Sequence, residues 1–170
     1  MRKSKLLSIA VVMVLLISLA ACAAKGPYKE RSSLVIADNP VCRIDMKAEV
    51  AGKDRIRLTF ENKSDKTCMY GNPYKLEYYS SGNWYKVPFN KDAGIFTMEG
   101  ILLGPAEEYA QKDNEDYMIS STNSMDVELS GMGKLPAGHY RIVKDFSILD
   151  VDGSPVETFY LAAEFDLSGS

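Results

Sequence analysis

The sequence is poor in the residues that most enzyme sites require. His139 is the single histidine among 170 residues, and no G-x-S-x-G or H-E-x-x-H motif accompanies it. A Ser-His-Asp triad or a histidine-based metal site would have to be built around His139, which lies in a turn-like stretch. We therefore expect His139 to be an exposed turn residue and the protein to be no enzyme, with no metal and no cofactor.

The chain also lacks an excess of positive charge. It has 20 Lys and Arg against 23 Asp and Glu. Residues 1–21 hold three of the cations and no anion, so the remainder has 17 cations against 23 anions, a net charge of −6. This acidic balance argues against nucleic acid as a partner, and against electrostatic docking on anionic lipid.

Long hydrophobic runs are absent except at the N-terminus. The stretch from Leu6 to Ala21 has 16 residues, fewer than the roughly 20 that a membrane-spanning helix needs. Three cations, at positions 2, 3 and 5, precede it, and Leu19-Ala20-Ala21-Cys22 ends it as a small-residue cleavage site with cysteine at the first mature position. This arrangement resembles the lipobox of bacterial lipoproteins, in which a diacylglycerol is attached to the cysteine thiol.

The resemblance implies an export and anchoring signal. We expect residues 1–21 to be a helical lipoprotein signal peptide and Cys22 to carry acyl chains of the palmitate kind. At about 0.8 kcal/mol per buried methylene, two chains hold a protein stably on a membrane, whereas one does so only marginally. The protein would then be lipid-anchored at the cell membrane, facing the extracytoplasmic side. An uncleaved signal anchor and ordinary cleavage without lipid remain the alternatives.

The rest of the chain has the length of one domain. Residues 22–37 lack a clear period and predict a lipidated N-terminus with a short flexible tether, and residues 38–170 predict a single domain. Within it, short runs alternate between apolar and polar residues. Cys42 to Val50 and Ile56 to Phe60 are the clearest of these runs. Seven or eight such strands, separated by turn residues, predict an all-β, immunoglobulin-like antiparallel β-sandwich.

Turn residues and two irregular stretches complete this pattern. Gly71-Asn72-Pro73 disturbs a strand expected over 68–79, and Asp150-Val151-Asp152-Gly153 marks a hairpin tip. Residues 107–123 are polar and acidic, which suggests an inserted loop. The stretch 135–140 ends on Tyr140, whose position after a proline and a glycine predicts a tyrosine corner, in which the hydroxyl bonds to backbone a few residues upstream.

Five short motifs are distributed along residues 40–167. They are Tyr70-Gly71, Tyr74-x-Leu76-Glu77, Gly82-x-Trp84-Tyr85-Lys86-Val87-Pro88, Leu135-Pro136-x-Gly138-x-Tyr140-Arg141-Ile142-Val143-Lys144 and Tyr160-Leu161-Ala162-Ala163-Glu164-Phe165. Together they resemble a bacterial immunoglobulin-like domain family found in lipoproteins and extracellular regions of Gram-positive bacteria, with the last two motifs the most specific. The resemblance implies a fold and a location, but no catalytic activity and no common ligand. The stretch 103–107 departs from the family's usual Leu-x-Pro-Gly-Glu.

Two cysteines remain after Cys22. Cys42 starts the first predicted strand, and Cys68 follows the loop after the second, so a hairpin would bring them near each other. An oxidising compartment would let a disulfide persist, and closing a loop of 26 residues would stabilise the fold by about 3.5 kcal/mol. We expect this disulfide; two buried free thiols are the alternative.

Aromatic residues concentrate around one predicted hairpin and give the one functional signal. Such rings offer broad apolar area with a polar tip, although core packing is their commoner use. The candidate binding surface consists of Tyr70, Tyr74, Tyr78, Tyr79 and Tyr85. Acidic groups at 113–116 and 150–152 do not complete a calcium-loop pattern, so solvated loops are expected there.

These observations predict a non-catalytic lipoprotein that binds or scaffolds a component of the cell envelope. Its partners would be the membrane, through the lipid, and an unknown protein or carbohydrate. The alternative is an extracellular ligand-sensing or accessory domain that works with a membrane signalling partner.

Overall fold

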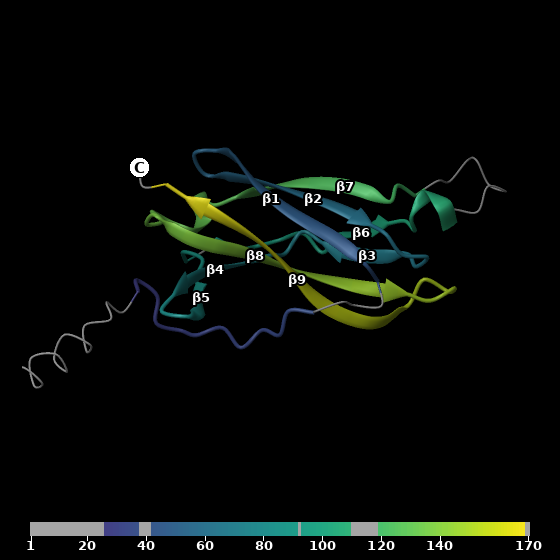
Figure 1. Ribbon diagram of the computed structural model, residues 1–170, viewed down its shortest axis with the longest axis horizontal. Helices are drawn as coiled ribbons and strands as arrows, with labels where there is room; N and C mark the ends of the chain where they lie inside the picture. Colours follow the sequence, from purple (N-terminus) through teal and green to yellow (C-terminus); the bar gives the residue numbers. More distant parts are fainter. Residues whose placement is uncertain (1–25, 38–41, 92, 110–118, 169–170) are drawn as a thin grey trace, which may run out of the picture.

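The computed structural model describes residues 26–37, 42–91, 93–109 and 119–168, and these form a sandwich of two antiparallel sheets (Figure 1). Strands β1, β2 and β7 make the smaller sheet, and β3–β6, β8 and β9 make the larger one. The elements are β1 Ile44–Gly52, β2 Arg55–Asn62, β3 Cys68–Gly71, β4 Lys75–Ser80, β5 Asn83–Val87, β6 Gly100–Leu103, η1 Glu107–Tyr109, β7 Thr122–Glu128, η3 Ser130–Met132, β8 Gly138–Leu149 and β9 Pro155–Leu167.

The all-β sandwich predicted from the alternation is confirmed, with nine strands in the described residues instead of seven or eight. Part of the difference comes from Gly71-Asn72-Pro73, which divides the strand expected over 68–79 into β3 and β4. Within residues 93–109 the structure has one strand, β6, Gly100–Leu103. The predicted insertion begins with the single turn η1, and most of it lies outside the described residues.

Strand β8 is central to the larger sheet, because it is long enough to pair with three other strands. On one side it pairs with β9 from Gly138 to Leu149. On its other side it pairs with β4 over residues 140–143 and then with β3 over residues 146–148. The backbone therefore changes partner at Lys144 and Asp145, opposite the loop that separates β3 from β4.

Lys144 closes the gap that this change of partner leaves. Its side chain is fully buried, and its ammonium group donates to the carbonyl of Gly71 and, at 2.6 Å, to that of Pro73. Burial lowers the pKa of Lys144 to about 8. The two carbonyls lie in the loop between β3 and β4, so one side chain provides the hydrogen bonds that a continuous strand would have supplied.

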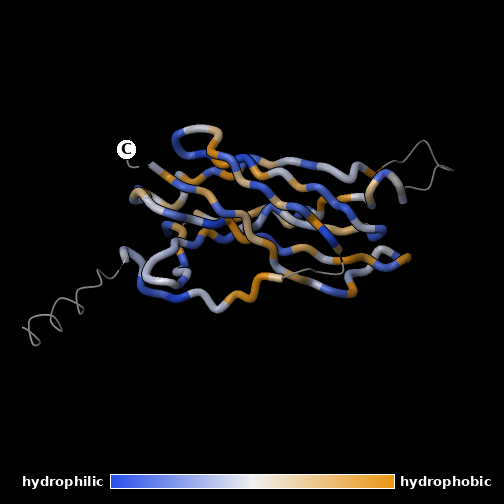
Figure 2. The backbone as a smooth tube through the Cα atoms, viewed as in Figure 1, coloured by the Kyte–Doolittle hydropathy of each residue, from blue (hydrophilic) through white to orange (hydrophobic). Residues whose placement is uncertain are grey.

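The core fills the space between the sheets. Hydrophobic positions alternate with hydrophilic ones along the strands (Figure 2), and the inward set includes Phe60, Tyr70 and Phe146, whose rings lie 4.8–5.5 Å apart. Cys42 and Cys68 form a disulfide, which joins the residues just before β1 of the smaller sheet to β3 of the larger one. The two sheets are thus tied covalently as well as by packing.

The corner before β8 is built around Tyr140. This side chain is fully buried, and its hydroxyl donates to the Pro136 carbonyl at 2.7 Å, the hydrogen bond of a tyrosine corner. Gly138 lets the Tyr78 ring pack closely, since a Cβ at that position would lie 2.4 Å from a ring carbon of Tyr78. The Tyr78 and Tyr140 rings meet edge to face at 5.1 Å.

Residues 26–37, here called the N-terminal strap, are packed against the larger sheet. The prediction of a flexible tether over 22–37 is therefore wrong for this part. The Ser32 N–H donates to the Trp84 carbonyl at 2.9 Å, the Lys86 N–H donates to the Glu30 carbonyl at 2.8 Å, and the Ala37 N–H donates to the Tyr160 carbonyl at 2.9 Å. The strap thus runs from the β5 edge to β9, along the side of the larger sheet away from β1, β2 and β7 (Figure 1).

Candidate binding surface

The outer face of the larger sheet carries two rows of aromatic and charged side chains, set by the strand register. Tyr79 on β4 is opposite Trp84 on β5, and His139 on β8 is opposite Asp166 on β9. Because β4 lies between β5 and β8, these residues line up across four strands. The first row is therefore aromatic at one end and acidic at the other.

Three rings of this row pack on one another and form what we call the aromatic cluster: Tyr79, Trp84 and His139. Ring centroids are 5.0 Å apart for Tyr79 and Trp84, 5.6 Å for Trp84 and His139, and 5.9 Å for Tyr79 and His139. Tyr79 is 42 % exposed, and the other two are half-buried. The cluster thus presents aromatic surface to solvent while each ring is held by its neighbours.

His139 is also held by two carboxylates of β9. Its Nδ1 lies 2.8 Å from Asp166 Oδ1, and its Nε2 lies 2.9 Å from Glu164 Oε2. Hydrogen bonding to Asp166, and then to Glu164, raises the pKa of His139 above its usual value. The expectation of an exposed turn residue is wrong: His139 lies within β8 and is half-buried.

The second row is a line of alternating charges beneath the rings. The register places Lys86, Glu77, Arg141 and Glu164 side by side across β5, β4, β8 and β9. Arg141 binds one oxygen of Glu77 twice, at 2.7 Å from Nε and 2.6 Å from the terminal nitrogen. The Glu77 side chain is only 1 % exposed, so this pair is desolvated and each charge depends on the other.

Two further contacts complete the environment of the buried pair. The Ser32 hydroxyl, from the N-terminal strap, donates to the second oxygen of Glu77. The Trp84 ring lies over the Arg141 guanidinium, 4.4 Å from the ring centroid. The position of Trp84 is thus fixed from below by a cation that is itself fixed by Glu77.

Comparison with known proteins agrees with this architecture. Residues 40–119 match the family model described as a bacterial Ig-like domain. This part of the chain is therefore similar to a bacterial Ig-like domain. The match covers β1 to η1, whereas the motifs at 135–144 and 160–165, expected to be the most specific, lie beyond it. No curated protein and no solved structure shows significant similarity to the chain.

The five tyrosines predicted as one surface of the domain separate into two groups. Tyr70 and Tyr74 are 3 % and 9 % exposed and belong to the core, so the prediction is wrong for them. Tyr78 is half-buried between Tyr28 and Tyr140. Tyr85 is half-buried beside the strap, where its backbone forms an isolated antiparallel β-bridge with Arg31. Tyr79 alone of the five joins the aromatic cluster.

The sequence reasoning missed His139, Glu164 and Asp166 as parts of this surface. They come together through the pairing register of β8 with β9, which the sequence pattern alone does not determine. The acidic tip of that hairpin forms the expected turn: Asp150 Oδ1 accepts the N–H groups of Asp152 and Ser154 at 3.0 and 2.8 Å. In the described parts of the chain no group of three or more metal-ligating side chains occurs.

Some predicted features lie outside the described residues. These are the signal peptide, the lipidation site Cys22 and the acidic cluster at 113–116. Within the described ranges, no helix has the length and hydrophobicity to cross a membrane.

Proposed function

We propose that the protein is a lipid-anchored, extracytoplasmic binding module whose Ig-like domain contacts a component of the cell envelope. The family consists of extracellular modules that are generally non-catalytic. The lipobox-like sequence ending at Cys22 supports the anchor. The disulfide between Cys42 and Cys68 supports an oxidising compartment outside the cytosol.

The aromatic cluster is the observation that carries the binding role. Tyr and Trp rings supply large contact area at small entropic cost when they are already fixed, as Trp84 is by Arg141. Beside the rings, the carboxylates of Glu164 and Asp166 offer hydrogen-bond acceptors at the surface. Stacking area next to polar groups suits a sugar ring or an aromatic protein contact.

The anchor is tested by cell fractionation of Cys22→Ser. Without the thiol no acyl chain can be attached, so the variant should leave the membrane fraction. A Cys42→Ser variant keeps the anchoring residue and serves as the matched control. Unchanged membrane retention of Cys22→Ser would show that the N-terminus is an uncleaved signal anchor, and the lipid proposal would fall.

The binding role is tested by pull-down with the mature chain, residues 22–170, carrying Cys22→Ser so that it stays soluble. The strap belongs to the folded sheet, so the bait must include it. We expect retention of one envelope polysaccharide or protein that is competed by excess free bait. If neither class is retained, the domain is a spacer and the binding proposal is refuted.

A further inference from the structure

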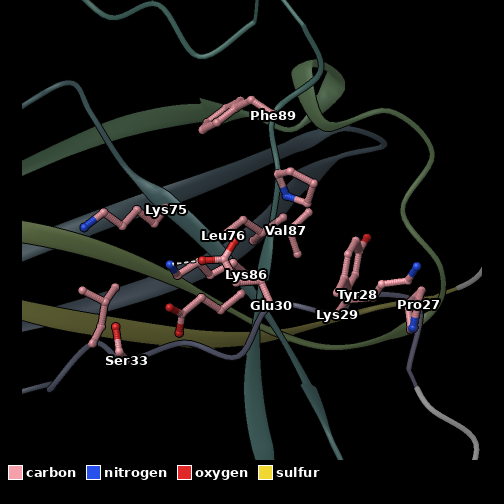
Figure 3. A pocket seen from close by; sticks show the side chains of 13 residues that line it. Pro27, Tyr28, Lys29, Glu30, Ser33, Lys75, Leu76, Lys86, Val87 and Phe89 are labelled. Atoms are coloured by element: carbon pink, nitrogen blue, oxygen red, sulfur yellow. Dashed lines mark hydrogen bonds and ion pairs between the residues drawn. The ribbon is translucent and has the colours of Figure 1, made fainter.

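A pocket of about 600 Å³ lies between the N-terminal strap and the β4–β5 hairpin, separate from the aromatic cluster (Figure 3). Its volume falls in the roughly 300–1,000 Å³ range of small-molecule sites. Tyr28 and Leu34 contribute from the strap, Lys75 and Leu76 from β4, and Val87 and Phe89 from β5 and the residues after it. The pocket therefore exists only because the strap is docked on the sheet.

One side of the pocket is apolar and rigid. Leu76 and Val87 are 1 % and 5 % exposed and form its floor. Phe89 is held edge to face against Tyr74 at 5.5 Å and Phe96 at 5.6 Å. Tyr28 packs on Tyr78 with ring centroids 5.5 Å apart. Because these walls are fixed by the core, an apolar ligand would enter without first ordering them.

The other side is cationic. In Figure 3, Lys75 and Ser33 lie at the side opposite Tyr28 and Pro27, with the Lys86–Glu30 pair between them. Lys86 is neutralised by Glu30, since Nζ and Oε1 are 2.5 Å apart. In the described residues Lys75 has no carboxylate partner, and its ammonium lies over the Tyr160 ring at 4.6 Å.

The charges of the lining residues indicate the sign of charge that the ligand should carry. Glu77, the remaining carboxylate of the lining, is already bound by Arg141 and Ser32. Lys29 and Lys75 are therefore the lining charges that no carboxylate of the described residues neutralises. Figure 3 shows Lys29 beside Tyr28 and Lys75 at the opposite end, so each end of the pocket has a cation that can attract an anionic group. The Lys75 end is the one that also has a hydroxyl, from Ser33, so we place the anionic group there.

We propose that this pocket binds an amphiphile with a single acyl chain and one anionic head group, a carboxylate or a phosphate. The chain lies between Leu34, Leu76 and Val87 toward Tyr28 and Phe89. The head group accepts hydrogen bonds from the Lys75 ammonium and the Ser33 hydroxyl. This site goes beyond the proposed envelope contact and does not depend on it, because the aromatic cluster contributes none of its lining.

The test uses the mature chain with Cys22→Ser and head-group-matched probes below their micelle concentrations. Dodecanoate and dodecyl phosphate are the anionic probes; dodecyl maltoside and dodecyltrimethylammonium have the same chain with neutral and cationic heads. Amide NMR shifts locate each probe, and calorimetry gives its affinity. We expect the anionic probes to shift Leu34, Leu76 and Val87, and to bind about tenfold more tightly than the cationic probe.

Variants separate the head-group contact from adsorption to the surface. Lys75→Met keeps the side-chain stem over Tyr160, and should weaken the anionic probes about fivefold without changing dodecyl maltoside. Lys53→Met, in the exposed β1–β2 turn, is the matched control and should change nothing. Tyr79→Ala should also leave acyl binding intact, so failure of the envelope contact and failure of this site are distinguishable.

A fifth probe distinguishes the sources of the ligand. Lysophosphatidylglycerol binding as tightly as dodecanoate would point to a membrane lipid, and dodecanoate binding alone would point to a free fatty acid. The proposal is overturned if the cationic probe binds as well as the anionic ones, if no probe binds, or if the shifts fall outside the pocket.

Discussion

The outer faces of the two sheets are built from the same kinds of charged residues but in different environments. On the smaller sheet, Arg57 on β2 pairs with Asp126 on β7 at 2.9 Å, and their side chains are 54 % and 32 % exposed. On the larger sheet, Arg141 pairs with Glu77 at exposures of 10 % and 1 %. Both pairs are cross-strand neighbours, so register alone does not explain the difference.

The difference comes from what covers each pair. Among the residues that the structure describes, no aromatic ring stacks on the Arg57–Asp126 pair and no strap side chain hydrogen-bonds to it. In contrast, Trp84 lies over Arg141 and the Ser32 hydroxyl donates to Glu77. A solvated ion pair contributes little to stability, whereas removing one partner of a buried pair leaves the other charge buried and uncompensated. The larger sheet therefore has a structured outer surface that can be specific, and the smaller sheet has a solvated one.

The largest effect should come from breaking the buried pair. Arg141→Met should lower the free energy of unfolding by about 3–5 kcal/mol, because Glu77 would stay buried without its partner. Arg57→Met removes the matching cation from the smaller sheet and should leave the denaturation midpoint unchanged. Urea unfolding of both variants measures this contrast. Equal effects would show that the two faces do not differ as described.

A smaller effect is expected where the strap meets the buried pair. Ser32→Ala removes a hydroxyl that donates to a carboxylate, which should cost about 1–2 kcal/mol and raise hydrogen exchange over residues 26–37. Ser33→Ala is the matched control, because Ser33 is exposed and it is the Ser32 hydroxyl that donates to Glu77. Unchanged exchange in Ser32→Ala would mean that the backbone bonds alone hold the strap.

The smallest effect should depend on pH. The pKa of His139 is raised in the fold by Asp166 and Glu164, so its contribution is fully present below the unfolded pKa of 6.5 and is lost as pH rises through the folded value. His139→Gln should therefore destabilise the domain at about pH 5.5 and have less effect at about pH 8.5. Thermal unfolding at both pH values checks this, and a loss that grows with pH would contradict it.

Much of the fold followed from local patterns in the chain. Alternation along Arg55–Asn62 and Phe159–Leu167 gives the inward and outward sides of β2 and β9 correctly. β8 departs from this alternation at two adjacent residues: Val143 is on the outer face but only 1 % exposed, and Lys144 is on the inner face and fully buried. The strap itself escaped prediction since its inward residues include Ser32, whose role depends on Glu77 far along the chain.

The candidate surface was less predictable than the fold. Proximity along the chain grouped the tyrosines, but Tyr70 and Tyr79 lie on opposite sides of the sheet, one in the core and one in the aromatic cluster. His139 joins the cluster only because β8 lies beside β4 and β9. Such contacts between distant segments are set by register, which the sequence pattern leaves open.

The central claim is that the outer face of the larger sheet is the contact surface. It is tested most directly by pull-down from envelope extracts with two matched double variants of the soluble mature chain. Tyr79→Ala/Trp84→Ala removes the rings of the larger sheet, and Arg55→Ala/Arg57→Ala removes exposed cations of the smaller one. We predict that the first variant loses the retained component while the second keeps it. Retention by the first variant, or loss by the second alone, would contradict the account.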